Sequence, residues 1–284
     1  MQIVQSPLNY TGSKANLIEQ LQDHFPGHIK GQFIDVFTGG GSVVLNTSYK
    51  RYVANDIIPW LIDFYKLIQI MDWDDLLNKI NQYKISKDSP EEYANLRNLF
   101  NNNQNHDEAS LMFFSLVSSC TNNLMRFNNS FKFNQTFGKR SINENTIKRL
   151  KAYFDLIKTK NIQFENKTFE LLIEENINPD NFFYLDPPYT STKEFKIEAG
   201  YNCYWSKQHE DNLWNCLKVL NDNNCKFAVS NILEKNGVKN PSYDKFKQWN
   251  LIELNYDYEK VARNKNSNII EILIKIIKTL WYIY

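Results

Sequence analysis

The sequence has few of the features that mark secreted or metal-stabilised proteins. It contains only four cysteines in 284 residues. Their spacing fits neither a metal-binding motif nor a disulfide framework, so we expect free thiols, no bound metal and a reducing cytoplasm. No basic segment followed by an apolar run opens the chain, so no signal peptide is expected. These cysteines are Cys120, Cys203, Cys216 and Cys225.

Long hydrophobic runs and a large net charge are also missing. The apolar stretch 269–284 is interrupted by Glu271, Lys275 and Lys278, and it is too short to span a bilayer, so no membrane association is expected. The net charge is +1, which excludes a global field that would attract polyanions.

Positive charge is nevertheless concentrated in one segment. Between Arg126 and Lys160 there are nine basic residues and two acidic ones. Such a block in a near-neutral protein is typical of a surface that contacts a phosphate backbone. A solvated helix face explains the part after Ile147 equally well, and explains the loop before it less well.

The apolar pattern predicts an α/β protein with an insertion. Residues 32–37 and 51–55 are predicted strands joined by a glycine turn and a short helix, which is the start of a parallel sheet. Residues 57–160 are mainly helical, and Ser89 and Ser141 each precede a capping-box pattern. Strands are predicted again at 162–164, 182–185, 225–230, 251–254 and 269–274, with a helix after Ser206.

The segment Asp186-Pro187-Pro188-Tyr189 is the most informative motif. It follows a buried apolar run, so Asp186 should lie at the carboxyl edge of the sheet, where open α/β sheets bind ligands. The two prolines lack N–H groups and form a stiff turn with free carbonyls, and Tyr189 offers a ring for stacking. The motif suits chemistry on the amine of a nucleobase, although a pair of prolines can also simply end a strand.

A glycine turn forms a second candidate site. Thr38-Gly39-Gly40-Gly41-Ser42 follows the strand that ends near Asp35 and Phe37, so a ligand could approach the backbone closely. Asp56 comes 21 residues after Asp35, at the distance expected for a carboxylate that accepts hydrogen bonds from ribose. The glycines match neither the dinucleotide fingerprint nor a P-loop.

A third element precedes both motifs. Tyr10 and Lys14 flank the turn Thr11-Gly12-Ser13, and together they could clamp a carboxylate and a ring. Taken alone, the pattern is better explained as a capped helix start.

The order of these motifs resembles the Dam-type DNA adenine N6-methyltransferases, D12 class, with the α-group order. The resemblance covers nearly the whole chain: Tyr-Thr-Gly-Ser-Lys, then Asp-x-Phe-x-Gly-Gly-Gly-Ser, then Ala54-Asn55-Asp56-Ile57, a helical insertion, and Asp-Pro-Pro-Tyr. Further matches are Trp205-Ser206, Val229-Ser230-Asn231 and Phe137-Gly138-Lys139-Arg140.

The resemblance implies a Rossmann-like S-adenosylmethionine-dependent methyltransferase sheet, formed by residues 1–56 and 161–284. Residues 57–160 would form an inserted, mostly helical domain that recognises double-stranded DNA. It implies that Asp186 lies near the target amine and the donor's methionine part. The other residues implied to contact the donor are Tyr10, Lys14, Asp35, Phe37, Gly39, Gly41, Ser42, Asp56 and Phe169.

The resemblance also implies which residues contact DNA. The family has Asn-x-Leu/Met-x-Arg in the insertion, and this chain has Asn122, Leu124 and Arg126 in that pattern. Arg126 and Arg140 would read base edges in the major groove, whereas Lys132 and Lys139 would bind phosphates. Family members commonly methylate adenine in GATC.

This chain departs from the family pattern at two positions. Thr121 stands where an aromatic residue usually fills the space of a displaced base, and Thr136 stands where proline usually precedes Phe-Gly. Thr136 remains among the expected DNA contacts. Both departures concern the sequence that is read and leave the chemistry unaffected.

The expected reaction is methylation of a flipped-out adenine. Asp186 and the carbonyl of Pro187 would accept hydrogen bonds from the two amine protons, Tyr189 would stack on the flipped base, and Pro188 would stiffen the turn, with no metal. The alternatives are a non-catalytic DNA-binding protein with this fold and an enzyme acting on RNA adenine. A cognate restriction endonuclease is an open expectation, and the sequence does not determine the recognition site, the genomic origin or the oligomeric state.

Overall fold

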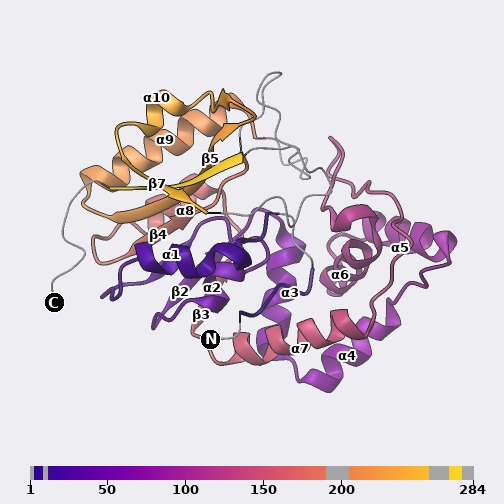
Figure 1. Ribbon diagram of the computed structural model, residues 1–284. Coiled ribbons are helices and arrows are strands. Elements are labelled where there is room, and N and C mark those ends of the chain that lie inside the picture. Colours follow the sequence, from indigo (N-terminus) through magenta and orange to yellow (C-terminus); the bar gives the residue numbers. More distant parts are fainter. Residues whose placement is uncertain (1–2, 9–11, 190–204, 256–268, 277–284) are drawn as a thin grey trace.

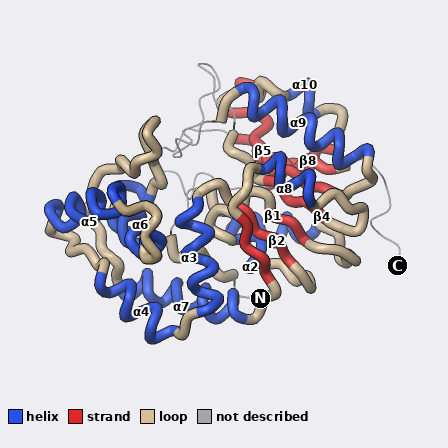
Figure 2. The backbone as a smooth tube through the Cα atoms, turned by 180° about the vertical axis from the view of Figure 1, so that it is seen from behind, coloured by secondary structure: helices blue, strands red, loops and turns tan. Residues whose placement is uncertain are grey.

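The computed structural model describes residues 3–8, 12–189, 205–255 and 269–276. Its centre is a mixed, mostly parallel sheet with helices on both faces and a helical lobe at one side (Figures 1 and 2). The strand order is β3-β2-β1-β4-β5-β8-β7, with β6 paired to β5. This confirms the α/β prediction and the Rossmann-like core. Among the described residues, no helix is long and apolar enough to cross a membrane.

The first five strands run parallel. In the order of the sheet they are β3 (Ile162–Glu165), β2 (Tyr52–Asn55), β1 (Phe33–Asp35), β4 (Phe182–Leu185) and β5 (Lys226–Lys235). The chain moves from β1 outward to β3 and then returns to the other side of β1 to form β4. The segments that follow β1 and β4 therefore meet at the switch point of the sheet, where α/β proteins bind ligands.

Alternation along the strands divides the core into two layers. In β4, Phe182 and Tyr184 pack on one face, whereas Phe183 and Leu185 pack on the other. Successive side chains of a strand point to opposite faces of the sheet. Because helices cover both faces, every position of a central strand must be apolar. This explains why the predicted strand is a continuous apolar run.

The N-terminal helices cover the first face of the sheet. They are η1 (Lys14–Leu17), α1 (Ile18–His24) and α2 (Ser42–Asn46). The Ser13 side chain accepts a hydrogen bond from the Ala15 amide and also contacts Ser42, with 2.8 Å between the two hydroxyl oxygens. The predicted Thr-Gly-Ser turn is therefore joined to the glycine turn that follows β1.

The insertion between β2 and β3 is helical, as the sequence predicts. It contains α3 (Pro59–Ile70), α4 (Trp73–Gln82), α5 (Pro90–Asn102), α6 (Ala109–Ser119), η2 (Thr121–Asn123) and α7 (Glu144–Lys158). Helix α3 packs against α6, α7 and β3. It therefore links the helical lobe to the sheet.

One predicted helix start is wrong. Ser89 caps α5 as expected, because its hydroxyl accepts from the Glu92 amide. The second cap is Asn143 rather than Ser141, since the Asn143 side chain accepts from the Thr146 amide and α7 begins at Glu144. Asparagine is at least as good an N-cap as serine, so the later of two suitable residues starts this helix.

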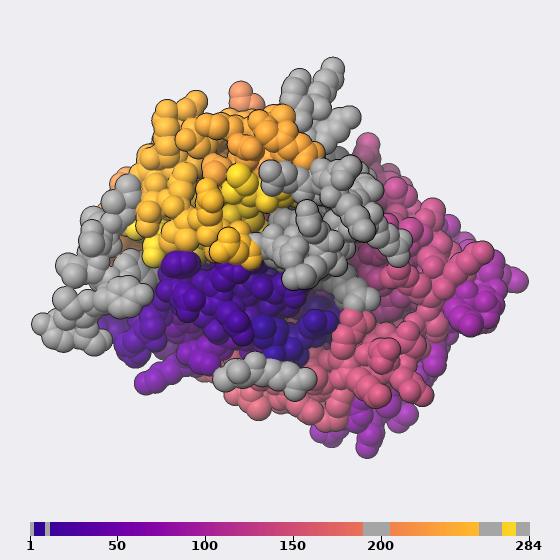
Figure 3. Space-filling model, in the orientation of Figure 1, coloured from indigo at the N-terminus to yellow at the C-terminus, as the bar shows by residue number. Residues whose placement is uncertain are grey.

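The C-terminal part covers the second face and extends the sheet. Its helices are α8 (Phe169–Glu175), α9 (Lys207–Asp222) and α10 (Tyr243–Phe246), and its strands are β6 (Val238–Lys239), β7 (Asn250–Leu254) and β8 (Ile269–Lys275). Strand β8 lies between β5 and β7 and is antiparallel to both. Figure 3 shows the indigo N-terminal part directly against this orange and yellow part, and Gln20 bonds to the Asn255 backbone.

Candidate active site

The strand that ends at Leu185 delivers Asp186 to the switch point of the sheet. The Asp186 side chain is 19% exposed, so it is accessible from a cavity or solvent and not enclosed by the core. Pro187 is buried, while Pro188 and Tyr189 are half-buried. The motif leaves the sheet as the sequence predicts.

A buried lysine holds one oxygen of Asp186. The Lys14 ammonium lies 3.0 Å from Oδ1, and the Tyr189 hydroxyl donates to the same oxygen at 3.0 Å. Lys14 also donates to the Tyr189 hydroxyl at 2.9 Å. Among the described residues, none donates a hydrogen bond to Oδ2 of Asp186. That oxygen is the one left to accept a hydrogen bond from a ligand.

Opposing effects set the pKa of Asp186. Burial raises it above the ordinary value for aspartate, and the Lys14 ammonium counteracts this increase. Lys14 itself is 7% exposed. Burial lowers its pKa, but Asp186 and a second carboxylate, Glu271, raise it further, so the net shift is upward and the ammonium is retained.

The glycine turn lies beside this pair, at the end of β1. Gly39 and Gly41 have positive φ angles of 47° and 74°, which glycine adopts without strain. A Cβ at Gly41 would lie 2.7 Å from the Tyr153 hydroxyl, so this turn tolerates no side chain. Tyr65 of α3 donates to the Gly39 carbonyl at 2.7 Å and fixes the turn from the opposite side.

Two buried carboxylates flank the turn. Asp56 accepts from the amides of Gly39 and Ile58 at 3.1 and 2.9 Å, and burial raises its pKa to about 6. In Asp35, Oδ2 accepts from the Thr38 hydroxyl at 3.1 Å, while Oδ1 is buried and has no hydrogen-bond partner among the residues that the structure describes. An unpaired buried carboxylate oxygen is costly, and burial raises the pKa of Asp35 to about 8.

The raised pKa of Asp35 predicts a pH dependence of stability. The folded protein retains the Asp35 proton up to about pH 8, whereas the unfolded chain releases it near pH 4. The free energy of unfolding should therefore fall as the pH rises through this interval. Asp35→Asn should remove this loss, so the variant should melt increasingly above the wild type from pH 5 to pH 8 in calorimetry. Parallel melting curves would contradict the prediction.

Three aromatic rings form a group next to the turn. The ring of Phe37 lies 5.6 Å from Phe169 and 5.8 Å from Trp205, and Phe169 lies 5.6 Å from Trp205. Buried Glu210 accepts the indole N–H of Trp205 at 2.9 Å and holds this ring in place. Trp205 was not among the residues predicted to form the site. Tyr10 lies outside the described residues.

The residues expected to contact DNA all lie in one irregular loop of the insertion. Isolated bridges pair Cys120 with Phe137 and Phe127 with Phe133, which brings the two halves of the loop together. Asn122, Lys132, Thr136, Lys139 and Arg140 are exposed, whereas Leu124 and Arg126 are half-buried.

Several of these side chains also hold the loop together. Arg126 donates from Nε and Nη2 to the side-chain and backbone oxygens of Asn134, at 3.0 and 2.9 Å. Arg140 donates to Asn123 at 2.7 Å, and Lys132 donates to the Asn101 carbonyl at 3.2 Å. A guanidinium held in this way is oriented before any partner arrives.

The two departures from the family pattern contact each other. The hydroxyl oxygens of Thr121 and Thr136 are 3.0 Å apart, and the Thr121 amide donates to the Thr136 carbonyl at 2.9 Å. A Cβ at Gly138 would lie 2.5 Å from the Cys120 carbonyl oxygen. The two chain segments at the base of the loop therefore approach each other closely, and the threonine pair is one of the contacts between them.

The basic segment separates into two parts, as the alternative explanation suggested. In α7, Lys151 pairs with Asp155, and Lys158 donates to the carbonyls of Gln69 and Met71. These lysines serve helix packing. The basic residues before α7 lie in the irregular loop.

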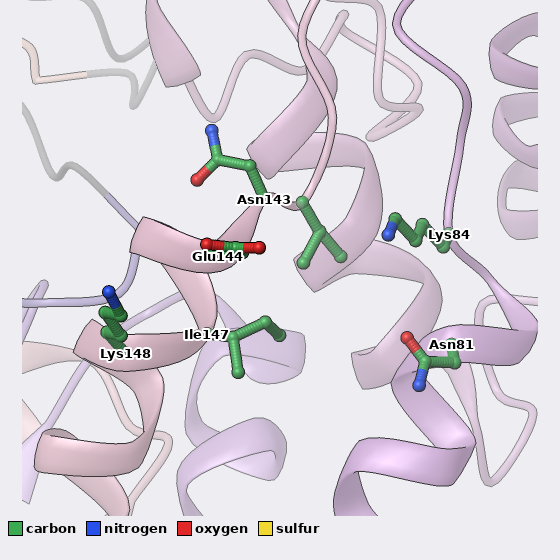
Figure 4. Close-up of a pocket in the computed structure, with 7 residues that line it drawn as sticks. Asn81, Lys84, Asn143, Glu144, Ile147 and Lys148 are labelled. Atoms are coloured by element: carbon green, nitrogen blue, oxygen red, sulfur yellow. The ribbon is translucent and has the colours of Figure 1, made fainter.

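A pocket elsewhere in the molecule is separate from these groups. It measures about 300 Å³ and lies between the end of α4 and the start of α7, where Asn81, Lys84, Asn143 and Lys148 contribute to its lining (Figure 4). No residue expected to bind the donor or DNA lines it.

Comparisons with known proteins agree with the order of motifs. A family model described as D12 class N6 adenine-specific DNA methyltransferase matches residues 10–269. The chain is 30% identical over 278 residues to modification methylase StsI of Streptococcus sanguinis, covering 93% of this chain and 41% of the relative. It is 27% identical over 269 residues to type II methyltransferase M.FokI of Planomicrobium okeanokoites, covering 92% and 41%.

A shorter relative gives a similar result. The chain is 28% identical over 197 residues to a DNA adenine methylase of Vibrio cholerae, covering 68% of this chain and 69% of the relative. By contrast, the chain spans about two fifths of the length of the StsI and M.FokI methylases.

Proposed function

Because the chain belongs to the D12 class of N6 adenine-specific DNA methyltransferases, we propose that it methylates the N6 amine of adenine in double-stranded DNA. The observation that carries this proposal is the unequal hydrogen bonding of the two Asp186 oxygens. One oxygen is held by Lys14 and Tyr189, and among the described residues the other accepts no hydrogen bond. An acceptor oriented in this way at the switch point suits an amine with two protons.

S-adenosylmethionine is the methyl donor that this class uses, and the residues present fit it. Oδ1 of Asp35, which has no partner among the described residues, would accept a hydrogen bond from the donor's ammonium group, whose charge would lower the raised pKa of that carboxyl, and Asp56 would accept from its ribose hydroxyls. Phe37, Phe169 and Trp205 offer apolar surface for its adenine. When bound, this cofactor supplies an electrophilic methyl group on a positively charged sulfur. Tyr10, Lys14, Gly39, Gly41 and Ser42 complete the proposed donor site.

The residues of the Asp-Pro-Pro-Tyr motif then orient the target. Extrusion of the adenine from the helix costs a few kcal/mol, and stacking on the Tyr189 ring would offset part of that cost. The Asp186 carboxylate and the Pro187 carbonyl accept hydrogen bonds from the two amine protons, which directs the nitrogen lone pair toward the methyl group, and one of these protons leaves the nitrogen once the methyl group is attached. Pro188 keeps the turn rigid. Catalysis then rests on positioning and electrostatics.

We further propose that the irregular loop reads the DNA sequence. Arg126 and Arg140 would contact base edges, Lys132 and Lys139 would contact phosphates, and Asn122, Leu124 and Thr136 would line the same surface. Residues 57–160 would form the recognition domain and the remainder the catalytic domain, with α3 and α7 of the recognition domain packed against β3 and α2 of the catalytic domain. GATC is the first sequence to test, because family members commonly methylate adenine in it. The Thr121–Thr136 pair at the base of the loop is where this chain departs from the family pattern, so related sequences should be tested beside it.

A comparison of duplex DNA, RNA and peptides identifies the substrate that receives the methyl group. Purified protein with tritiated S-adenosylmethionine should label duplex DNA at N6 of adenine, and should leave RNA and peptides unlabelled. Sequencing of the product with modification detection would identify the recognition site. Label in RNA alone would favour the RNA enzyme, and DNA binding without labelling would favour the non-catalytic alternative.

Asp56 gives the donor site a pH dependence that can be measured. Only the ionised carboxylate can accept hydrogen bonds from ribose while it holds the Gly39 and Ile58 amides. Since burial raises its pKa to about 6, donor affinity should fall about tenfold for each pH unit below that value. Calorimetric titrations from pH 5 to pH 8 would measure this. Asp56→Asn should bind weakly and should lose the additional decline that begins near pH 6, and an unchanged decline below pH 6 in this variant would exclude Asp56 as its cause.

A restriction endonuclease of matching specificity is the proposed functional partner, and the cytoplasm the proposed location. If such an enzyme exists, DNA methylated by this protein should resist its cleavage.

A further inference from the structure

A carboxylate from the last described strand reaches the ion pair at Asp186. Glu271 of β8 is 3% exposed, and its Oε1 lies 3.1 Å from the Lys14 ammonium. The Tyr189 hydroxyl is 3.4 Å from the same oxygen. Neither the motif nor the glycine turn contains this residue, which lies 85 positions after Asp186 in the sequence.

Strand geometry explains why Glu271 faces the site. Ile272 and Ile274 pack with α9 on the second face of the sheet, whereas Leu273 packs on the first face. Because successive side chains of a strand point to opposite faces of the sheet, Glu271 lies on the same face as Leu273. This is the first face, where η1 carries Lys14. Core packing gives no reason for a charged residue here, because an apolar side chain would avoid the cost of desolvating a carboxylate.

The geometry indicates what Glu271 does to Lys14. The ammonium lies between two carboxylates at nearly equal distances, 3.0 Å from Asp186 and 3.1 Å from Glu271. Without Glu271, Asp186 would be the remaining carboxylate paired with the ammonium, beside the Tyr189 hydroxyl and the Gly12 carbonyl, which also accept from it. Lys14 could then move across that carboxylate and donate to Oδ2 as well as Oδ1. The second carboxylate therefore keeps the ammonium on the Oδ1 side.

We propose that Glu271 is a positioning residue of the methyltransferase site, which holds Lys14 beside Oδ1 of Asp186 and so leaves Oδ2 available to the adenine amine. This inference rests on the proposed function, because it assigns that amine as the partner of Oδ2. Glu271 itself contacts neither the substrate nor the cofactor in this proposal.

The charge of Glu271 also acts on Asp186. Four groups face the Asp186 carboxylate with it: Lys14 from η1, Tyr184 from β4, Tyr189 from the motif and Asp35 from β1. Burial raises the pKa of Asp186, Lys14 lowers it, and Glu271 raises it again. Removal of the Glu271 charge should therefore lower the pKa of Asp186.

The variant Glu271→Gln tests the proposal. It keeps the shape and leaves Lys14 paired with Asp186, so the protein should fold. We expect kcat for DNA methylation to fall roughly tenfold, because a small misplacement of an acceptor is costly. The acidic limb of the kcat profile, measured at saturating donor so that protonation of Asp56 does not determine it, should move down by about one pH unit, since one like charge has been removed.

A second measurement requires neither donor nor DNA. Two carboxylates raise the pKa of Lys14, so loss of one should lower that pKa. The Lys14 amine should then react several-fold faster with acetic anhydride at pH 8. Peptide mass spectrometry would measure the extent of acetylation. Glu271→Asp keeps the charge and should restore both the pH profile and the low reactivity. Glu253→Gln is the matched control, because exposed Glu253 on the neighbouring β7 carries the same charge away from the site.

The outcomes separate this inference from the proposed function. Lower activity with an unchanged pH profile and unchanged Lys14 reactivity would reduce Glu271 to a structural role and overturn the proposal. Unchanged activity would overturn it as well. If the wild type methylates no DNA, the proposed function fails, and unaltered Lys14 reactivity in the variant would still refute the placement of Lys14 by Glu271.

Discussion

Replacement of Asp186 by alanine should abolish almost all methyl transfer and leave DNA binding intact. Mutations of one oriented group that stabilises a transition state typically cost 10²–10³-fold in kcat, and we expect a loss of about this size or larger. The physical reason is that Oδ2 is the acceptor that orients the amine. Single-turnover rates with a duplex that contains the recognition site, together with DNA affinity, would measure the two effects separately.

The fold should survive this change, because Lys14 keeps a partner. Glu271, which lies 3.1 Å from the ammonium in the wild-type structure, should continue to pair with Lys14 in the variant, so no buried charge is left unpaired. Asp186→Asn is the matched control for shape. It retains one acceptor oxygen but loses the charge, and its activity should lie between those of the alanine variant and the wild type. Near-normal turnover in Asp186→Ala would remove this residue from the chemistry.

Replacement of Arg126 by alanine should reduce sequence discrimination more strongly than overall affinity. A good bidentate contact to a base contributes about 1–3 kcal/mol of discrimination, which corresponds to roughly tenfold or more between the preferred duplex and single-base variants. The bonds from Arg126 to Asn134 hold the guanidinium in one orientation. Competition binding with a panel of single-base variants would measure the change.

Asn134→Ala distinguishes base reading from loop support. It removes the side-chain bond to Nε while the backbone carbonyl still accepts from Nη2, so discrimination should fall only modestly. Lys132→Ala should weaken binding to all duplexes alike and reduce its salt dependence. If Arg126→Ala also weakens every duplex equally, Arg126 is a phosphate contact.

Much of the fold follows from local pattern. The continuous apolar run of β4 and the glycine turn after β1 predicted both segments that meet at the switch point, and each predicted strand is present. The strand predictions succeed because a central parallel strand must be apolar on both faces. The start of α7 was misplaced because Ser141 and Asn143, two positions apart, are both suitable caps.

The residues that complete the site from a distance could not be predicted in the same way. Tyr65 and Tyr153 reach the glycine turn from helices of the insertion, and Glu271 reaches Lys14 from β8. Such contacts depend on tertiary packing rather than on spacing. Glu271 did leave one signal, since a charged residue in the middle of an apolar strand is costly unless it has a partner.

The position of β8 has a consequence for biosynthesis. Because β8 lies between β5 and β7, residue 271 joins the sheet only after nearly all the preceding chain has left the ribosome. A nascent chain that already contains residues 14 and 186 would lack their third partner. The nascent chain should therefore hold Lys14 between its two carboxylates only once residue 271 has emerged and β8 has entered the sheet between β5 and β7.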